Sequence, residues 1–195
     1  MSIVYSLHDS LYLNITNRCP NRCTFCVRNL TDNLGDADTL WLSTEPDFDE
    51  MRRELISWDM RKYKEIVFCG YGEPTERIDL VIQLAEHIKK EYKKRIRLNT
   101  NGMGNLINGR DIVPSLKMFD AVSISLNAPD EETYLELTDC IFGEGCYSEL
   151  LSFIENCKKY ISSVTVSVVS GTITDEQERT CLEMAERMGV KFLSR

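Results

Sequence analysis

Short apolar runs alternate along this chain with longer stretches in which apolar residues recur at every third or fourth position. Many of the runs are rich in β-branched residues and are bounded by turn-forming residues, which is the pattern of strands. They predict strands at residues 3–6, 11–16, 64–69, 95–99, 121–126, 164–169 and 190–193. His8, Asp9 and Ser10 form a turn between the first two strands, so we expect an N-terminal β-hairpin.

The stretches with helical spacing fall between these strands. They predict helices from residue 46 to about residue 58, from Thr75 onward, and at residues 112–118, 130–138, 147–160 and 174–188. Thr75 is the expected N-cap of the second helix. Thr174 and Gln177 form a capping-box pattern that opens the last one.

This alternation of strands and helices predicts an α/β fold in which a parallel sheet carries its helices on the outside. A complete eight-stranded βα barrel needs about 250 residues, and this chain has 195. We therefore expect a single domain, residues 1–195, that forms a partial, open βα barrel of about six parallel strands with outer helices and an N-terminal hairpin. In such folds the functional residues follow the C-terminal ends of the strands.

Composition narrows the candidate functions. Acidic residues outnumber basic ones by 31 to 23, giving a net charge of about −8, which argues against nucleic acid or an anionic membrane surface as a partner. No apolar run is long enough to span a bilayer and no signal peptide is recognisable, so we expect a cytoplasmic protein. Two histidines are too few for a multi-histidine zinc site, and eight cysteines are too few for a disulfide scaffold.

Cys19, Cys23 and Cys26 form the most informative cluster, with the spacing CxxxCxxC on the loop after the second predicted strand. A structural zinc site would need a fourth ligand, which no histidine or second CxxC at a plausible spacing supplies. Unligated core cysteines would not favour a polar loop rich in Asn and Arg. Three thiolates can instead hold a 4Fe–4S cluster and leave one iron open to an exogenous ligand. We therefore expect these three cysteines to be metal ligands and the catalytic centre.

The triplet resembles the signature of the radical S-adenosylmethionine (SAM) superfamily, CxxxCxΦC, whose aromatic position is occupied here by Phe25. Three further segments resemble superfamily motifs in the same order: GYGEP from residue 70, NTNG from residue 99 and SLN from residue 125. The resemblance extends over residues 11–192 and implies a 4Fe–4S cluster and SAM as cofactors. The residues that it implies as cofactor-binding are Phe25, Gly70, Tyr71, Gly72, Glu73, Asn99, Thr100, Asn101, Ser125 and Asn127.

In the chemistry that this resemblance implies, the amino and carboxylate groups of SAM chelate the open iron. One electron from the reduced cluster then cleaves SAM to methionine and a 5′-deoxyadenosyl radical, which abstracts hydrogen from a substrate. The chain would be an anaerobic oxidoreductase that receives electrons from an external donor of the flavodoxin or ferredoxin type. Its substrate, a small molecule or a peptide, is not identified by the sequence. Glu73 is the implied acceptor for the SAM ammonium group.

The chain departs from the superfamily pattern at two places. Tyr71 replaces the second glycine of the superfamily's GGEP motif, in which backbone groups carry much of the function. The adenine-contacting motif would fall at Val168 or Val169, where the match is poor. The overall pattern looks most similar to the TatD-linked radical SAM group.

Three alternatives stay open. Carboxydeazaguanine synthases are similar in size, but they carry a magnesium-binding threonine after the third cysteine, where this chain has Val27-Arg28-Asn29. Glycyl-radical activases also form small open barrels. A protein of a different class, a non-catalytic iron–sulfur electron carrier or SAM-binding module, would need Cys69, Cys140 or Cys146 as a fourth cluster ligand.

Residues 27–45 show little regular pattern and connect the cysteine loop to the first helix. A loop of this length in a domain is usually functional or disordered. We expect it to form a mobile cover over the substrate.

Overall fold

The computed structural model describes residues 1–195 and contains one seven-stranded sheet with the strand order β1-β2-β3-β4-β5-β6-β7. β1 (Val4–Leu7) and β2 (Ser10–Leu13) form the antiparallel hairpin that the sequence predicts. The other strands all run parallel to β2: β3 (Glu65–Phe68), β4 (Arg95–Thr100), β5 (Ala121–Ser125), β6 (Val164–Val168) and β7 (Lys191–Ser194). Because β1 and β7 are unpaired edges, the six parallel strands form an open, partial barrel, which confirms the predicted fold class.

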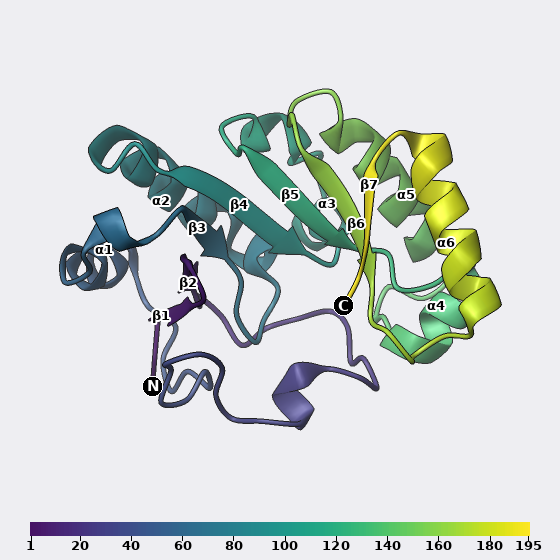
Figure 1. Ribbon diagram of the computed structural model, residues 1–195, viewed down its shortest axis with the longest axis horizontal. Coiled ribbons are helices and arrows are strands. Elements are labelled where there is room, and N and C mark those ends of the chain that lie inside the picture. Colours follow the sequence, from purple (N-terminus) through teal and green to yellow (C-terminus); the bar gives the residue numbers. More distant parts are fainter.

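Six helices occupy the connections between the strands. They are α1 (Phe48–Ile56), α2 (Ile78–Glu91), α3 (Gly104–Asn108), α4 (Glu131–Thr138), α5 (Cys146–Cys157) and α6 (Asp175–Met188). Figure 1 shows the helices gathered around the outside of the curved sheet, whereas the purple and blue segment between β2 and α1 runs beneath the opposite side. No helix has both the length and the apolar character needed to cross a membrane.

The two faces of the sheet differ in polarity because successive side chains of a strand point to opposite faces. On the outer face, Leu98 of β4 and Val166 of β6 belong to one continuous core of 40 buried residues that the helices cover. On the inner face, Arg97 and Asn99 of β4 and Ser167 of β6 are polar. The inner face therefore forms a polar lumen that residues 14–47 border.

Several predicted elements differ from the structure. The helix predicted at residues 147–160 ends at Cys157, and α3 was not predicted. Thr75 does not cap α2: Glu73 caps a 3₁₀ turn, Pro74–Arg77, by accepting the Thr75 backbone N–H at 3.0 Å, and α2 begins only at Ile78. The strand predicted at residues 11–16 ends at Leu13. The helix predicted at residues 112–118 is a 3₁₀ turn, Val113–Leu116.

Candidate active site

A cavity of about 450 Å³ lies at the carboxyl ends of the strands. One part of its wall is the cysteine loop and the start of the next segment, and the rest comes from residues that end or follow β4, β5, β6 and β7. Seven of the predicted site residues line it: Cys19, Cys23, Phe25, Cys26, Asn101, Ser125 and Asn127. The sheet topology thus brings residues 19–26 together with Asn101, Ser125 and Asn127, which lie at least 75 positions later in the sequence.

The cysteine loop is held against the end of α4 by backbone hydrogen bonds. The Arg22 N–H donates to the Thr138 carbonyl at 2.7 Å, and the Thr24 N–H donates to the Leu137 carbonyl at 3.0 Å. Asn21 is buried, and its Nδ2 donates to the Tyr134 hydroxyl at 3.2 Å. These contacts fix the loop in place, so the thiols face the cavity from a preorganised backbone.

The donor chemistry of this loop fits a cluster. Burial raises the pKa of the Cys19 thiol to about 12 and that of Cys23 to about 11, so both are protonated at neutral pH and metal loading would release protons. No three His, Cys, Asp or Glu side chains converge on one metal ion. The three thiols are instead spread around one cavity, as ligands to separate irons of a cluster must be. Asn21 also lines the cavity, and its buried Oδ1 has no hydrogen-bond partner in the protein.

None of the other cysteines lines this cavity. Cys140 and Cys146 are buried members of the hydrophobic core, and so are Cys157 and Cys181. Cys69 follows β3 and is not part of the cavity wall. The cavity therefore offers three thiol ligands from protein.

The loop after β3 packs directly against the segment that leads to Cys19. The backbone N–H of Gly72 donates to the Thr16 carbonyl at 3.0 Å, and that of Glu73 donates to the Arg18 carbonyl at 2.8 Å. A Cβ atom at Gly72 would overlap both of these carbonyl oxygens, and one at Gly70 would overlap the side chain of the residue after β2. Both glycines are therefore required by the close approach of the two loops.

Glu73 joins this loop to the end of β4. Its carboxylate is buried, and Oε1 accepts hydrogen bonds from the Thr75 N–H at 3.0 Å, the Thr75 hydroxyl at 2.7 Å and the Thr100 hydroxyl at 2.8 Å. Oε2 accepts only the Asn101 N–H, at 2.7 Å. Burial raises the pKa of Glu73, and these hydrogen bonds act in the opposite direction. Oε2 retains acceptor capacity, but neither Glu73 nor Thr100 is part of the cavity wall.

Asn101 touches the cysteine loop itself. Its Nδ2 donates to Cys19 Sγ at 3.7 Å, and its Oδ1 accepts from the Met103 backbone N–H at 2.9 Å. The second contact fixes the orientation of the amide, so that its NH₂ group faces the sulfur. The NTNG segment thereby supplies a hydrogen bond to a candidate cluster ligand.

The structure places the Tyr71 side chain outside the cavity wall. It is buried with Tyr5, Ala37 and Leu40 in a small second apolar cluster, and its hydroxyl donates to the Thr31 carbonyl. The residue that departs from the superfamily motif therefore anchors residues 27–45 to the barrel.

The segment 27–45 is fastened to the barrel along much of its length. Asn17 exchanges two hydrogen bonds with the Leu42 backbone, at 2.7 and 3.1 Å, and Asn14 Nδ2 donates to the Leu40 carbonyl at 2.8 Å. Only its first part borders the cavity, where Val27 and Leu30 are exposed. A cover formed by this segment would thus involve the region around these two residues, and its mobility stays a prediction.

The remaining predicted residues differ in whether they line the cavity. Asn127 lines the cavity and adopts a left-handed backbone conformation, with φ of 62°, that asparagine tolerates better than most residues. Val169 also lines it, whereas Val168 is a core residue. Asn99 lies deeper, where its Oδ1 accepts from Arg97 Nη1 at 2.7 Å. Asn99 is therefore not part of the cavity wall.

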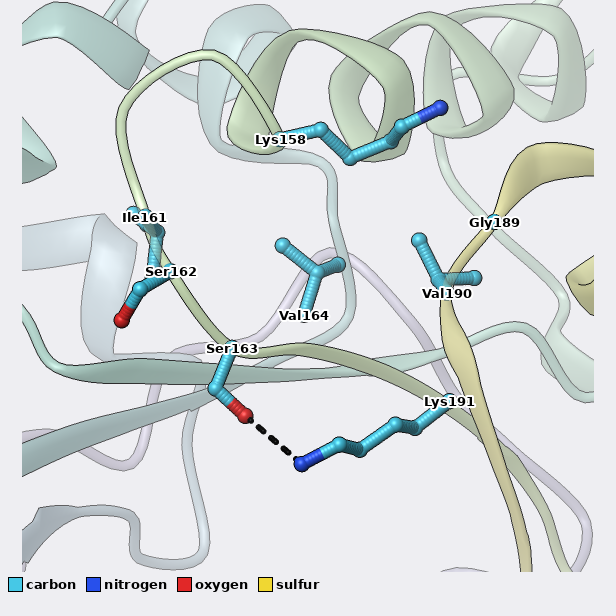
Figure 2. A pocket seen from close by; sticks show the side chains of 8 residues that line it. All are labelled: Lys158, Ile161, Ser162, Ser163, Val164, Gly189, Val190 and Lys191. Carbon is cyan, nitrogen blue, oxygen red and sulfur yellow. Dashed lines mark hydrogen bonds between the residues drawn. The ribbon is translucent and has the colours of Figure 1, made fainter.

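A second hollow, of about 470 Å³, lies at the opposite end of the barrel, beside the amino ends of β6 and β7. Figure 2 shows Lys191 hydrogen-bonded to Ser163, while Lys158 extends along the other side of the hollow. Lys158 pairs with Glu155 at 2.8 Å. This end of a βα barrel usually contributes to stability rather than catalysis, so the cavity at the carboxyl ends is the candidate active site.

Comparisons with known proteins agree with this geometry. The profile of the Radical SAM superfamily matches residues 13–185. A probable GTP 3′,8-cyclase of Methanocaldococcus jannaschii is 30% identical over 131 residues, which is 66% of this chain and 40% of that protein. A radical SAM methyltransferase from Sphaerobacter thermophilus superposes with a TM-score of 0.67 at 16% identity, over 98% of this chain and 57% of that one. Streptococcus suis SuiB bound to S-adenosylmethionine gives 0.68 at 15% identity, over 96% and 41%. The chain spans less than half the length of the curated relatives it matches.

Proposed function

This chain belongs to the radical SAM superfamily, and on that premise we propose that it cleaves SAM reductively at the cavity described above and abstracts hydrogen from a substrate there. Members of the superfamily bind a 4Fe–4S cluster and SAM, and they need an electron donor. The observation that carries the proposal is the cavity wall, which contains three cysteines and no fourth, opposite residues that follow β4, β5 and β6. A ligand held there can complete the coordination that three thiols leave open.

The roles of individual residues follow from their positions. Cys19, Cys23 and Cys26 would hold the cluster, which supplies the electron for cleavage of the sulfonium–C5′ bond. Phe25, Ser125 and Asn127 line the space in which SAM would lie. Glu73 positions the NTNG segment and offers the free capacity of Oε2 to the SAM ammonium group. Gly70 and Gly72 hold the GYGEP loop against the cysteine loop.

The substrate is open within this proposal. The matched relatives named GTP 3′,8-cyclase make GTP the first compound to test, and a small molecule of another kind or a peptide comes next. The electron donor that we propose is of the flavodoxin or ferredoxin type. Assignment to the TatD-linked group stays a prediction, because the family match is to the superfamily as a whole.

The test is anaerobic reconstitution of the full chain with iron and sulfide, followed by dithionite and SAM. We expect 5′-deoxyadenosine and methionine to accumulate in equal amounts. If the reconstituted protein contains 4Fe–4S clusters but forms no 5′-deoxyadenosine above the dithionite blank, an electron carrier or a SAM-binding module is the better description.

Replacing Asn101 by Leu should make the midpoint potential of the cluster more negative. The substitution keeps the size of the side chain but removes the N–H that faces Cys19 Sγ, and hydrogen bonds to cluster sulfurs influence the potential. Loss of one such bond, about 1 kcal/mol, corresponds to a shift of roughly 40 mV for one electron. An EPR-monitored redox titration measures it.

Asn156→Leu is the matched control, because Asn156 lies on α5 and contacts Lys159 rather than the cavity. A potential that is the same in Asn101→Leu and in the wild type would show that Asn101 does not act on the cluster.

A further inference from the structure

The wall of the cavity contains a single charged side chain, that of Arg195, which directly follows β7. No aspartate, glutamate or lysine lines the cavity. The chain has a net charge of −8, so acidic residues that could pair with an arginine are plentiful. None of them lies in the wall of this cavity beside Arg195.

The guanidinium of Arg195 reaches into the lumen. Its Nη2 donates to the hydroxyl of Ser167, which is fully buried on β6. The backbone of Arg195 is fixed as well, since its N–H donates to the Val168 carbonyl at 3.1 Å and its carbonyl accepts from the Ser170 N–H at 2.7 Å. The side chain is therefore directed into the lumen by its backbone and by Ser167. Arginine has five N–H donors, and the protein uses one of them here.

Arg97, the other arginine of the lumen, is in a different situation. Its Nε and Nη2 donate to Glu65 Oε1 at 3.0 and 2.8 Å, and its Nη1 donates to Asn99. Glu65 also lies 3.7 Å from Arg95, so its charge is shared between two arginines at the start of β3 and β4, whereas Arg195 forms no ion pair. Burial, together with the charge of Arg97, lowers the pKa of Arg195. The lumen beside the cavity thus carries a positive charge that no acidic residue of the protein neutralises.

We propose that Arg195 recognises an anionic group of the substrate, a carboxylate or a phosphate, with the uncommitted edge of its guanidinium. A planar guanidinium binds either group through two parallel hydrogen bonds. This inference rests on the proposed function. There the carboxylate of SAM would bind the open iron, so Arg195 stays available for the substrate, the second molecule in the cavity. It predicts that substrates of this enzyme carry a negative charge at one end.

The test is isothermal titration calorimetry on the reconstituted, SAM-saturated full chain at low ionic strength, with inorganic pyrophosphate and succinate as separate probes. Wild type should bind at least one probe, and that probe should bind about tenfold more weakly to Arg195→Gln. Arg195→Lys keeps the charge but not the paired donors, so it should give an intermediate affinity. Arg187→Gln, on the exposed surface of α6, should match wild type. Which probe responds distinguishes a phosphate from a carboxylate.

Two results would overturn the proposal. One is equal affinity of wild type and Arg195→Gln for both probes. The other is a weaker affinity of Arg195→Gln for SAM without any change for the probes, since Arg195 would then bind the carboxylate of SAM. Failure of the proposed function is a separate result, because it would appear in the wild type as absence of 5′-deoxyadenosine while the anion site could still be measured.

Discussion

Cys23→Ala is expected to lower the iron content of the reconstituted protein from about four per chain to below one and to reduce 5′-deoxyadenosine formation to that of the protein-free blank. The cavity wall supplies only three thiols, and Cys140 and Cys146 are packed in the core where they cannot take over. Loss of one thiol therefore removes a third of the protein's ligands. Iron and sulfide analysis together with product quantification measures both effects.

The fold should survive this substitution. Cys23 lies on a loop whose backbone is held through Arg22 and Thr24, so the free energy of unfolding of the metal-free chain should change by less than about 1 kcal/mol. Cys181→Ala is the matched control: it removes a buried thiol of α6 that is remote from the cavity and should leave the iron content unchanged. Full iron content in Cys23→Ala would contradict the assignment of the ligands.

Glu73→Gln is expected to destabilise the protein by about 1–3 kcal/mol and to weaken SAM binding about tenfold. The Glu73 carboxylate is the acceptor in all four of its hydrogen bonds. A glutamine must place its own NH₂ group against at least one of them, which leaves buried donors unpaired. The linked GYGEP and NTNG segments then lose their common partner. Urea denaturation and equilibrium SAM titration measure the two effects.

The pH dependence gives a second readout for Glu73. Burial raises its folded-state pKa above the unfolded value of about 4.3. Its contribution to the free energy of unfolding is therefore fully present below pH ~4.3 and is lost as the pH rises through the folded-state pKa. The stability advantage of wild type over Glu73→Gln should shrink over that range. Glu86→Gln, on an exposed position of α2, should show no such trend, and a trend of the opposite sign would contradict the assignment.

The order and type of most elements could be predicted from the sequence because each has a local cause. Apolar runs give the seven strands, and the capping box of Thr174 and Gln177 opens α6 as expected, with both of its hydrogen bonds present. Local signals failed where tertiary contacts dominate. Gly104 is a poor helix former, yet it lies in α3, where its small size allows close packing against Ile112 and Thr75.

The sequence predicted which residues line the candidate site better than it predicted the contacts that support them. Seven candidate residues share the cavity because parallel strands end at the same edge of the sheet. Nothing in the spacing of Glu73, Thr100 and Asn101 indicates that the carboxylate would bind the other two residues, since they lie in different loops. Arg195 carried no motif at all. Its position depends on the register of β7 with β6, which only the assembled sheet defines.

The central claim is that three cysteines hold a cluster with one open iron that SAM occupies. The most direct measurement is the EPR spectrum of the dithionite-reduced, reconstituted protein, recorded with and without SAM. The account predicts that SAM changes the g-values of the reduced cluster and that ¹⁷O in its carboxylate produces a hyperfine coupling. A spectrum that saturating SAM leaves unchanged, from a protein with full iron and sulfide content, would contradict it.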